Sequence, residues 1–117
     1  MKYAYQNSNI LKHCYLFLDI CHRKRLIFSF QLLQLLTDVN VDYLVGQVRA
    51  GAQMLQIFES HAEHLGPDLF VKFCVPYLSQ ICDRVKEKLG KDAVPMTVFA
   101  KGGGHHSLES LRYFYIY

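Results

Sequence analysis

The sequence lacks the ligand spacings of a structural metal site. It has four cysteines, none of them in a CxxC motif: Cys14, Cys21, Cys74 and Cys82. The His61-x-x-His64 tract has no second pair, whereas zinc sites draw on two such pairs or on H-E-x-x-H. We therefore expect no metal, and we expect the cysteines to act as small buried hydrophobes in a reducing cytosol.

Long hydrophobic runs are also missing. The most apolar N-terminal run, CYLFLDIC, is short, contains Asp19 and is followed at once by His22-Arg23-Lys24-Arg25. A bilayer crossing needs ~20 predominantly apolar residues. A secretory signal would carry its charge before the apolar run rather than after it. The sequence thus predicts a cytoplasmic chain with no membrane partner.

Neither sign of charge is in strong excess. The chain has 13 Lys and Arg against 10 Asp and Glu, a formal charge of +3, and much of the excess lies in the four residues 22–25. A run so short and isolated is typical of a solvated turn rather than a nucleic-acid site. With 117 residues and 51% hydrophobic composition, the chain is expected to fold around one modest core.

Catalytic and phosphate-binding signatures are weak. No Ser-His-Asp or Cys-His arrangement and no acid–base pair of carboxylates stands out. The loop Lys101-Gly102-Gly103-Gly104 follows an apolar segment, as phosphate-cradling loops do, but it is neither a Walker motif nor G-x-G-x-x-G. Phosphate binding there is a weak alternative. His105 and His106 could face a ligand, although flexible-loop histidines are the commoner case.

A clear helical period begins at Phe30. One apolar stripe is predicted to face the core: Leu32, Leu35, Leu36, Val39 and Tyr43. The opposite face is predicted to hold Gln34, Thr37, Asp38 and Asp42. Gly51 is well placed to end this helix in a left-handed conformation. The apolar residues of 1–29 follow neither the helical nor the strand period, and the one element considered there is a short helix over roughly 9–21.

The remaining periods alternate between strand and helix. Residues 53–59 and 94–100 are predicted strands, and both are largely apolar, which is typical of a parallel sheet. The helix between them should begin at Gly66-Pro67, kink or restart at Pro76 and stop at Gly90. This order predicts an α/β fold with a right-handed parallel crossover. Two such strands cannot close a sheet, so the chain resembles part of something larger, such as an eight-fold barrel.

Ser60 is the main candidate for a ligand contact. It follows the first predicted strand, at the carboxyl edge where parallel α/β folds bind ligands. Ser60-His61-Ala62-Glu63 also has the S-x-x-E form of a capping box, in which Ser and Glu satisfy free backbone amides. From the residues alone the cap is favoured.

Several blocks between residues 31 and 111 resemble one family. They are YLVGQV-x-AGA, FESHA-x-HLGP, KF-x-x-PY and VPM-x-x-FAK, in this order. Together they resemble the middle of eukaryotic uroporphyrinogen decarboxylase over about two-thirds of the chain.

The resemblance implies a (β/α)8 barrel, a cytosolic homodimer and a role in porphyrin and heme biosynthesis. It implies that the acetate arms of uroporphyrinogen, a poly-carboxylate tetrapyrrole, lose carbon dioxide to give coproporphyrinogen without cofactor or metal. Ser60 would correspond to a substrate-binding position, and Phe58, on the same strand face, would be a plausible apolar wall of the pocket.

The sequence departs from this family at both ends. Residues 1–29 and 113–117 do not resemble it, which leaves 30–112 as a partial barrel. The family's arginine-bearing segment, pyrrole-binding aspartate, substrate-binding tyrosine and late histidine have no counterpart, so no catalytic residue is expected here. AKGGGHH also stands where AKDGH is expected.

These departures predict a truncated or mis-spliced product, or an imperfect gene model, joined to the family near Ser29 and inactive alone. The alternative is a non-catalytic fragment that docks on full-length subunits. A third reading, a corrin-dependent methyltransferase, would need zinc ligands that this sequence does not supply.

Overall fold

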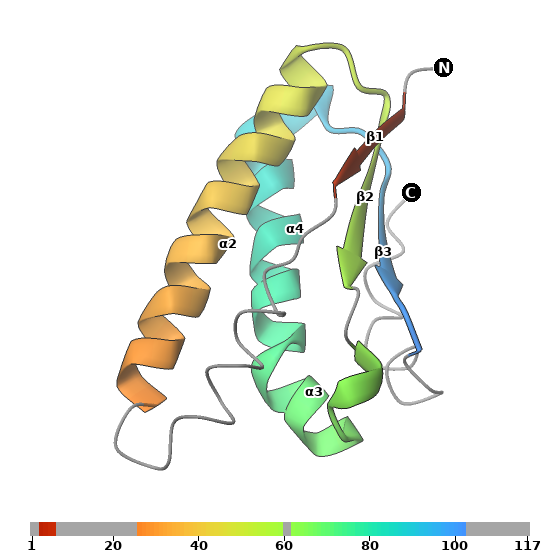
Figure 1. The fold of residues 1–117 in the computed structure, drawn as a ribbon. Helices are drawn as coiled ribbons and strands as arrows, with labels where there is room; N and C mark the ends of the chain where they lie inside the picture. Colours follow the sequence, from red (N-terminus) through yellow and green to blue (C-terminus); the bar gives the residue numbers. More distant parts are fainter. Residues whose placement is uncertain (1–2, 7–25, 60–61, 103–117) are drawn as a thin grey trace.

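Helices and a small parallel sheet alternate along the chain (Figure 1). The computed structural model describes residues 3–6, 26–59 and 62–102. The elements are β1 (Tyr3–Gln6), α2 (Leu26–Arg49), β2 (Met54–Glu59), the 3-10 turn η1 (Ala62–His64), α3 (Pro67–Phe73), α4 (Val75–Leu89), the 3-10 turn η2 (Gly90–Asp92) and β3 (Met96–Ala100). The mixed α/β class predicted from the sequence is confirmed.

The sheet has three parallel strands in the order β1-β2-β3. Ile57 in its centre pairs with Gln6 on one side and Val98 on the other. The two predicted strands are present, each shortened by one or two residues at its start. The expectation of only two strands is wrong, because β1 joins the sheet from within residues 1–29. Four residues are too few to reveal a strand period.

The helix α2 is turned differently from its predicted orientation. Leu35, Val39 and Tyr43, expected in the core, are 59%, 58% and 52% exposed. The buried face instead carries Ser29, Leu33, Thr37, Asn40, Val41, Leu44 and Val45. Apolar residues occur on two faces of this helix, so the 3.6-residue period alone did not decide which face is buried. The predicted helix over 9–21 lies outside the described residues.

The polar residues of α2 meet α4 along one seam. Gln34 Nε2 donates to Gln80 Oε1 at 3.0 Å, Arg84 pairs with Asp38, and Lys88 Nζ lies 2.6 Å from Asp42 Oδ1. The partners advance by four residues on both helices, so α2 and α4 run in the same direction. That is the arrangement expected when successive strands are parallel and each is followed by a helix.

The predicted breaks in the chain are found where glycine and proline stand. Pro67 begins α3, and the chain restarts as α4 at Val75 with Pro76 in its first turn, where the missing N–H is tolerated. Gly51 and Gly90 follow α2 and α4 with φ of 102° and 54°, a region that glycine adopts without strain. These positions confirm the helix boundaries read from the sequence.

One core joins the helices to one face of the sheet. Leu55 and Ile57 of β2 and Met96 of β3 are at most 3% exposed and cluster with apolar residues of α2, α3 and α4. The alternate residues of β2 and β3 point to the other face, where Phe99 is 51% exposed. No described helix covers this second face. None of the described helices is both long and apolar enough to cross a membrane.

Candidate functional site

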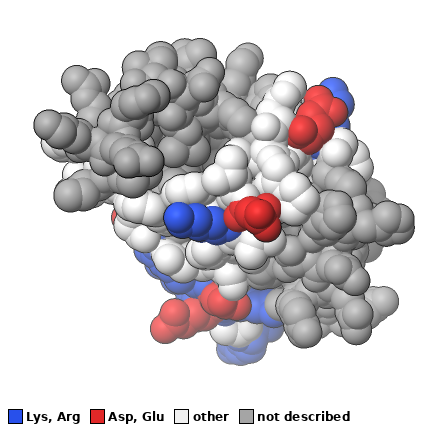
Figure 2. Space-filling model, turned by 90° about the horizontal axis from the view of Figure 1, so that it is seen from below, with Lys and Arg blue, Asp and Glu red and all other residues white. Residues whose placement is uncertain are grey.

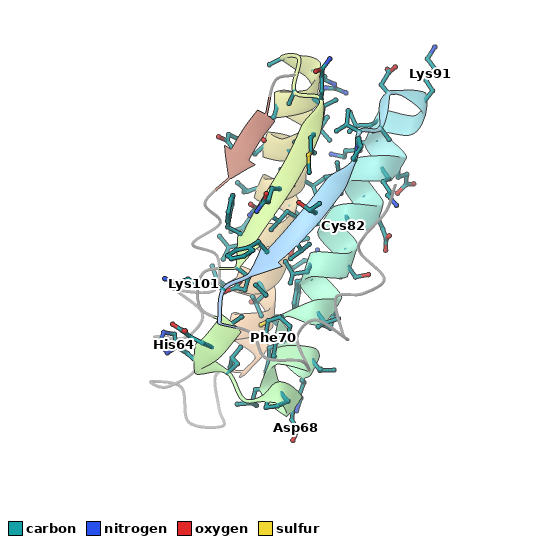
Figure 3. The ribbon with its side chains drawn as sticks, turned by 90° about the vertical axis from the view of Figure 1, so that its right-hand side faces the viewer. His64, Asp68, Phe70, Cys82, Lys91 and Lys101 are labelled. Carbon is teal, nitrogen blue, oxygen red and sulfur yellow. The ribbon has the colours of Figure 1, made fainter. Side chains whose placement is uncertain are left out.

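The candidate site lies at the carboxyl end of β2 and β3. Lys101 and His64 lie at this end of the sheet, whereas Lys91 lies at the opposite end (Figure 3). The backbone N–H of Lys101 donates to the carbonyl oxygen of Glu59 at 2.9 Å, which continues the pairing of the two strands by one residue. Two polar segments singled out in the sequence, after each strand, are thereby brought together.

Ser60 and His61 lie outside the described residues, and so do Gly103, Gly104, His105 and His106. The role predicted for Ser60 therefore stays a prediction. Its neighbours define the surroundings: Glu59 before it and Ala62 after it are each 2% exposed. The short helix α3 begins beyond this turn with Gly66 at its N-cap and no side-chain cap.

Phe58 lies on the sheet face that no described helix covers. It is half-buried, and its ring packs edge-on against the ring of Phe99, its register partner on β3, with centroids 6.0 Å apart and planes at 65°. An edge-to-face pair of this kind is a favoured aromatic geometry. The two rings form an apolar patch directly beside the carboxyl edge. Phe99 was missed in the sequence, although its position at the equivalent point of the second strand could have identified it.

Charged groups of both signs follow the strands. Glu63 and His64 lie 3.8 Å apart between Oε1 and Nε2, and both side chains are about half exposed. Glu63 also packs against Gly102, whose φ is +69°. Seen from the end nearest α3, basic and acidic side chains of the described residues lie beside one another rather than in a patch of one sign (Figure 2).

Metal-ligand candidates are sparse in the described part of the chain. No group of three or more His, Cys, Asp or Glu residues comes together there. Cys74 and Cys82 form no disulfide with a described residue and lie on the buried face of the α3–α4 segment, each 1% exposed. Burial, aided by the nearby charge of Asp83, raises the pKa of Cys82 to about 12, so this thiol is protonated at neutral pH.

Together these features define a class of protein: a parallel α/β chain with helices on one sheet face and a polar edge at the strand carboxyl ends. The family model for uroporphyrinogen decarboxylase (URO-D) matches residues 14–116. The chain belongs to the uroporphyrinogen decarboxylase family. The match reaches upstream of residue 30 and therefore includes part of the segment that resembled nothing by motif.

Individual relatives agree with this assignment. The chain is 58% identical over 86 residues to uroporphyrinogen decarboxylase of Homo sapiens, covering 71% of this chain and 23% of that protein. It is 53% identical over 77 residues to the Schizosaccharomyces pombe protein of the same name, covering 63% and 21%. The Salinibacter ruber protein is 51% identical over 83 residues, covering 71% and 23%. The chain thus spans about a quarter of the length of these relatives.

Proposed function

We propose that this chain is a central piece of a uroporphyrinogen decarboxylase and supplies neighbouring βα units of a (β/α)8 barrel. The carrying observation is the family match over residues 14–116. The fold supports it in two ways: the sheet order follows the chain order, and the described helices lie on one sheet face. In a closed barrel the other face of the sheet is the filled interior, which suits the Phe58–Phe99 patch.

The proposed reaction is the cofactor-free removal of carbon dioxide from the acetate arms of uroporphyrinogen. Protonation of a pyrrole carbon makes the ring an electron sink. The bond between the arm and its carboxylate then breaks with release of carbon dioxide, and its electron pair enters the ring. Protonation of the resulting methylene carbon and loss of the proton added to the ring carbon restore the pyrrole and leave a methyl group. In this scheme the complete enzyme, not this chain alone, holds the poly-anionic macrocycle with basic residues and stabilises the cationic pyrrole with a carboxylate.

Within this scheme we assign substrate contact to two residues of the chain. Ser60 donates or accepts a hydrogen bond with a polar edge of the macrocycle, and Phe58 forms an apolar wall beside it. The position of Phe58 at the carboxyl edge supports the second assignment. The arginine, aspartate, tyrosine and histidine functions of the family have no counterpart in residues 30–112, so this chain has no catalytic group of its own.

We further propose that residues 30–112 form the partial barrel of the family, between residues 1–29 and the tail 113–117, which share none of its quoted motifs although the family model extends over residues 14–116. The complete enzyme is placed in the cytoplasm as a homodimer, without metal, cofactor, nucleic acid or membrane partner. The family resemblance supports the compartment and the dimer. The helix α2 begins at Leu26 and runs on through residue 30, so the first boundary falls within a helix.

The first test is turnover. The purified chain is incubated with uroporphyrinogen under reducing, dark conditions, with human uroporphyrinogen decarboxylase as the active control, and the number of carboxylates on the product is followed by chromatography. We expect turnover by the control alone. Stepwise loss of carboxylates with this chain would refute its assignment as inactive.

The second test is binding, with uroporphyrin, the fluorescent oxidised form of the substrate, as the probe. Ser60→Ala and Phe58→Ala should each weaken binding by roughly tenfold, the size of one lost hydrogen bond or apolar contact. Ser79→Ala on α4 and Phe28→Ala on the exposed side of α2 are matched controls with unchanged affinity. Equal losses in the controls would contradict the site assignment.

One observation favours the second candidate function, a non-catalytic piece that docks on full-length subunits. Leu35, Val39 and Tyr43 form an exposed apolar stripe on α2, and such stripes favour association. If the stripe mediates docking, the chain should co-elute with full-length human enzyme in gel filtration, and Leu35→Glu combined with Val39→Glu should abolish co-elution. Co-elution that survives both changes would exclude this stripe as the contact.

A further inference from the structure

Gly102 leaves a space that the side chain of Glu63 fills. A Cβ built on Gly102 would lie 2.6 Å from the Glu63 Cβ and 3.0 Å from its Cδ, and closer still to Oε2. Such close distances essentially never occur between a real Cβ and its neighbours. Gly102 also has φ of +69°, which disfavours any other residue. The close approach and the backbone conformation therefore require glycine independently.

A second tie joins the same two segments. The N–H of Lys101 donates to the carbonyl oxygen of Glu59 at 2.9 Å, one residue before Gly102. Glu59 and Glu63, on either side of residues 60–61, thus each contact the backbone after β3. Glu59 is buried, but the Glu63 side chain is 47% exposed, so burial alone does not hold Glu63 in place.

We infer that Glu63 is a positioning residue, which holds the turn after β2 against the Lys101–Gly102 backbone by filling the space above Gly102. The consequence for substrate rests on the proposed function, since the turn contains Ser60. The contact itself does not rest on it. The two parts therefore have separate tests.

The contact is tested by a double-mutant cycle of Glu63→Gly and Gly102→Ala, read by urea unfolding of the full chain. In the parent, Gly102→Ala brings both crowding and backbone strain, whereas the Glu63→Gly variant lacks the Cβ, Cδ and Oε2 that cause the crowding, so only the strain remains. We expect the unfolding constant to rise roughly tenfold more in the parent than in the Glu63→Gly variant, within the range measured for residues in contact. Equal effects in both backgrounds would overturn the inference.

Gly90→Ala is the matched control, because it introduces backbone strain at a positive φ without crowding a neighbouring side chain. Gly90 also has a positive φ, 54°, but a Cβ there would meet nothing within 4 Å. The effect of Gly90→Ala on the unfolding constant should be the same in the parent and in the Glu63→Gly variant. A coupling between Gly90 and Glu63 as large as that of Gly102 would mean that the cycle reports global changes, and would overturn the inference as well.

Positioning is tested by amide hydrogen exchange at the two ends of the β2–β3 pair. Lys101 N–H bonds to Glu59 at the carboxyl end, and Leu55 N–H bonds to the Pro95 carbonyl at 3.0 Å at the other. Glu63→Ala should speed exchange of Lys101 about tenfold relative to Leu55, and Glu63→Gln, which keeps the shape, should restore it. Equal acceleration at both amides, or no protected amide in either strand of the parent, would refute a positioning role.

Binding of uroporphyrin separates this inference from the proposed function. If Glu63 positions a substrate-contacting turn, Glu63→Ala weakens binding and Glu63→Gln restores it. A change in Lys101 exchange without any change in affinity supports the positioning contact and overturns the substrate role of this edge. Unchanged exchange overturns the positioning contact whatever the affinity.

Discussion

The orientation of α2 can be tested with one substitution made at two positions. Leu44 is fully buried and Leu35 is 59% exposed, although the apolar period placed Leu35 in the core. Both positions lie inside the same helix, so Leu→Ala changes helix propensity by the same small amount at each. Any difference between the two variants therefore reports which face is packed.

The expected magnitudes follow from burial. Removing a fully buried leucine side chain costs about 3 to 5 kcal/mol, because the lost transfer free energy is joined by a cavity term. At Leu35 less than half of the side chain is buried and water refills the space, so the cost is at most ~1 kcal/mol, a fraction of the ~1.5–3 kcal/mol gained by complete burial. Small domains are stable by only ~5–15 kcal/mol, so Leu44→Ala removes a large share.

Urea unfolding followed by circular dichroism measures both values. With a slope of ~1–3 kcal/mol per molar urea, Leu44→Ala should lower the midpoint by about 1 M or more and Leu35→Ala by a few tenths. Equal shifts, or a larger shift for Leu35→Ala, would refute the orientation and restore the face expected from the sequence.

Two titratable groups give further predictions. The hydrogen bond from Arg84, supported by one from Gln34, holds the pKa of the Asp38 carboxyl below its usual range. The ionised Asp38 carboxyl therefore stabilises the fold fully above the pKa of the unfolded state, near pH 4. This stabilisation is lost as the pH falls through the lower pKa of the folded state. The stability difference between the parent and Asp38→Asn should therefore shrink below pH 4 in acid titrations of unfolding, and a constant difference would contradict it. Because burial raises the pKa of Cys82 to about 12, iodoacetamide at pH 8 should leave it unmodified until urea unfolds the chain, as peptide mapping can determine. Rapid labelling in native buffer would show that α4 is not packed as described.

The helix boundaries marked by glycine and proline were readable from the sequence, whereas α2 begins at Leu26, before the helical period that starts at Phe30. Gly51, Pro67, Pro76 and Gly90 each restrict the backbone through their own chemistry, and each stands where a helix ends, begins or restarts. The strands at 54–59 and 96–100 were readable because both are dense in apolar residues. Such signals do not depend on distant contacts.

The features that depend on contacts between residues distant in the sequence were not predicted. The facing of α2 follows from its packing against α4 and β2, and β1 forms because β2 offers it a partner. The contact between Glu63 and Gly102 joins residues far apart in sequence, and only a glycine after a strand hinted at it. At the candidate site, the sequence predicted a role for the carboxyl edge and for Phe58, which stays a prediction, and it did not predict the Phe99 ring that packs against Phe58.

The sheet order β1-β2-β3 has a consequence for association. A closed barrel has no edge strands, whereas β1 and β3 each have only one neighbour among the described strands. Backbone donors and acceptors along such an edge can pair with a further strand, from another copy or another protein. A strand added at either edge would extend this sheet in the same way as a further βα unit extends a barrel.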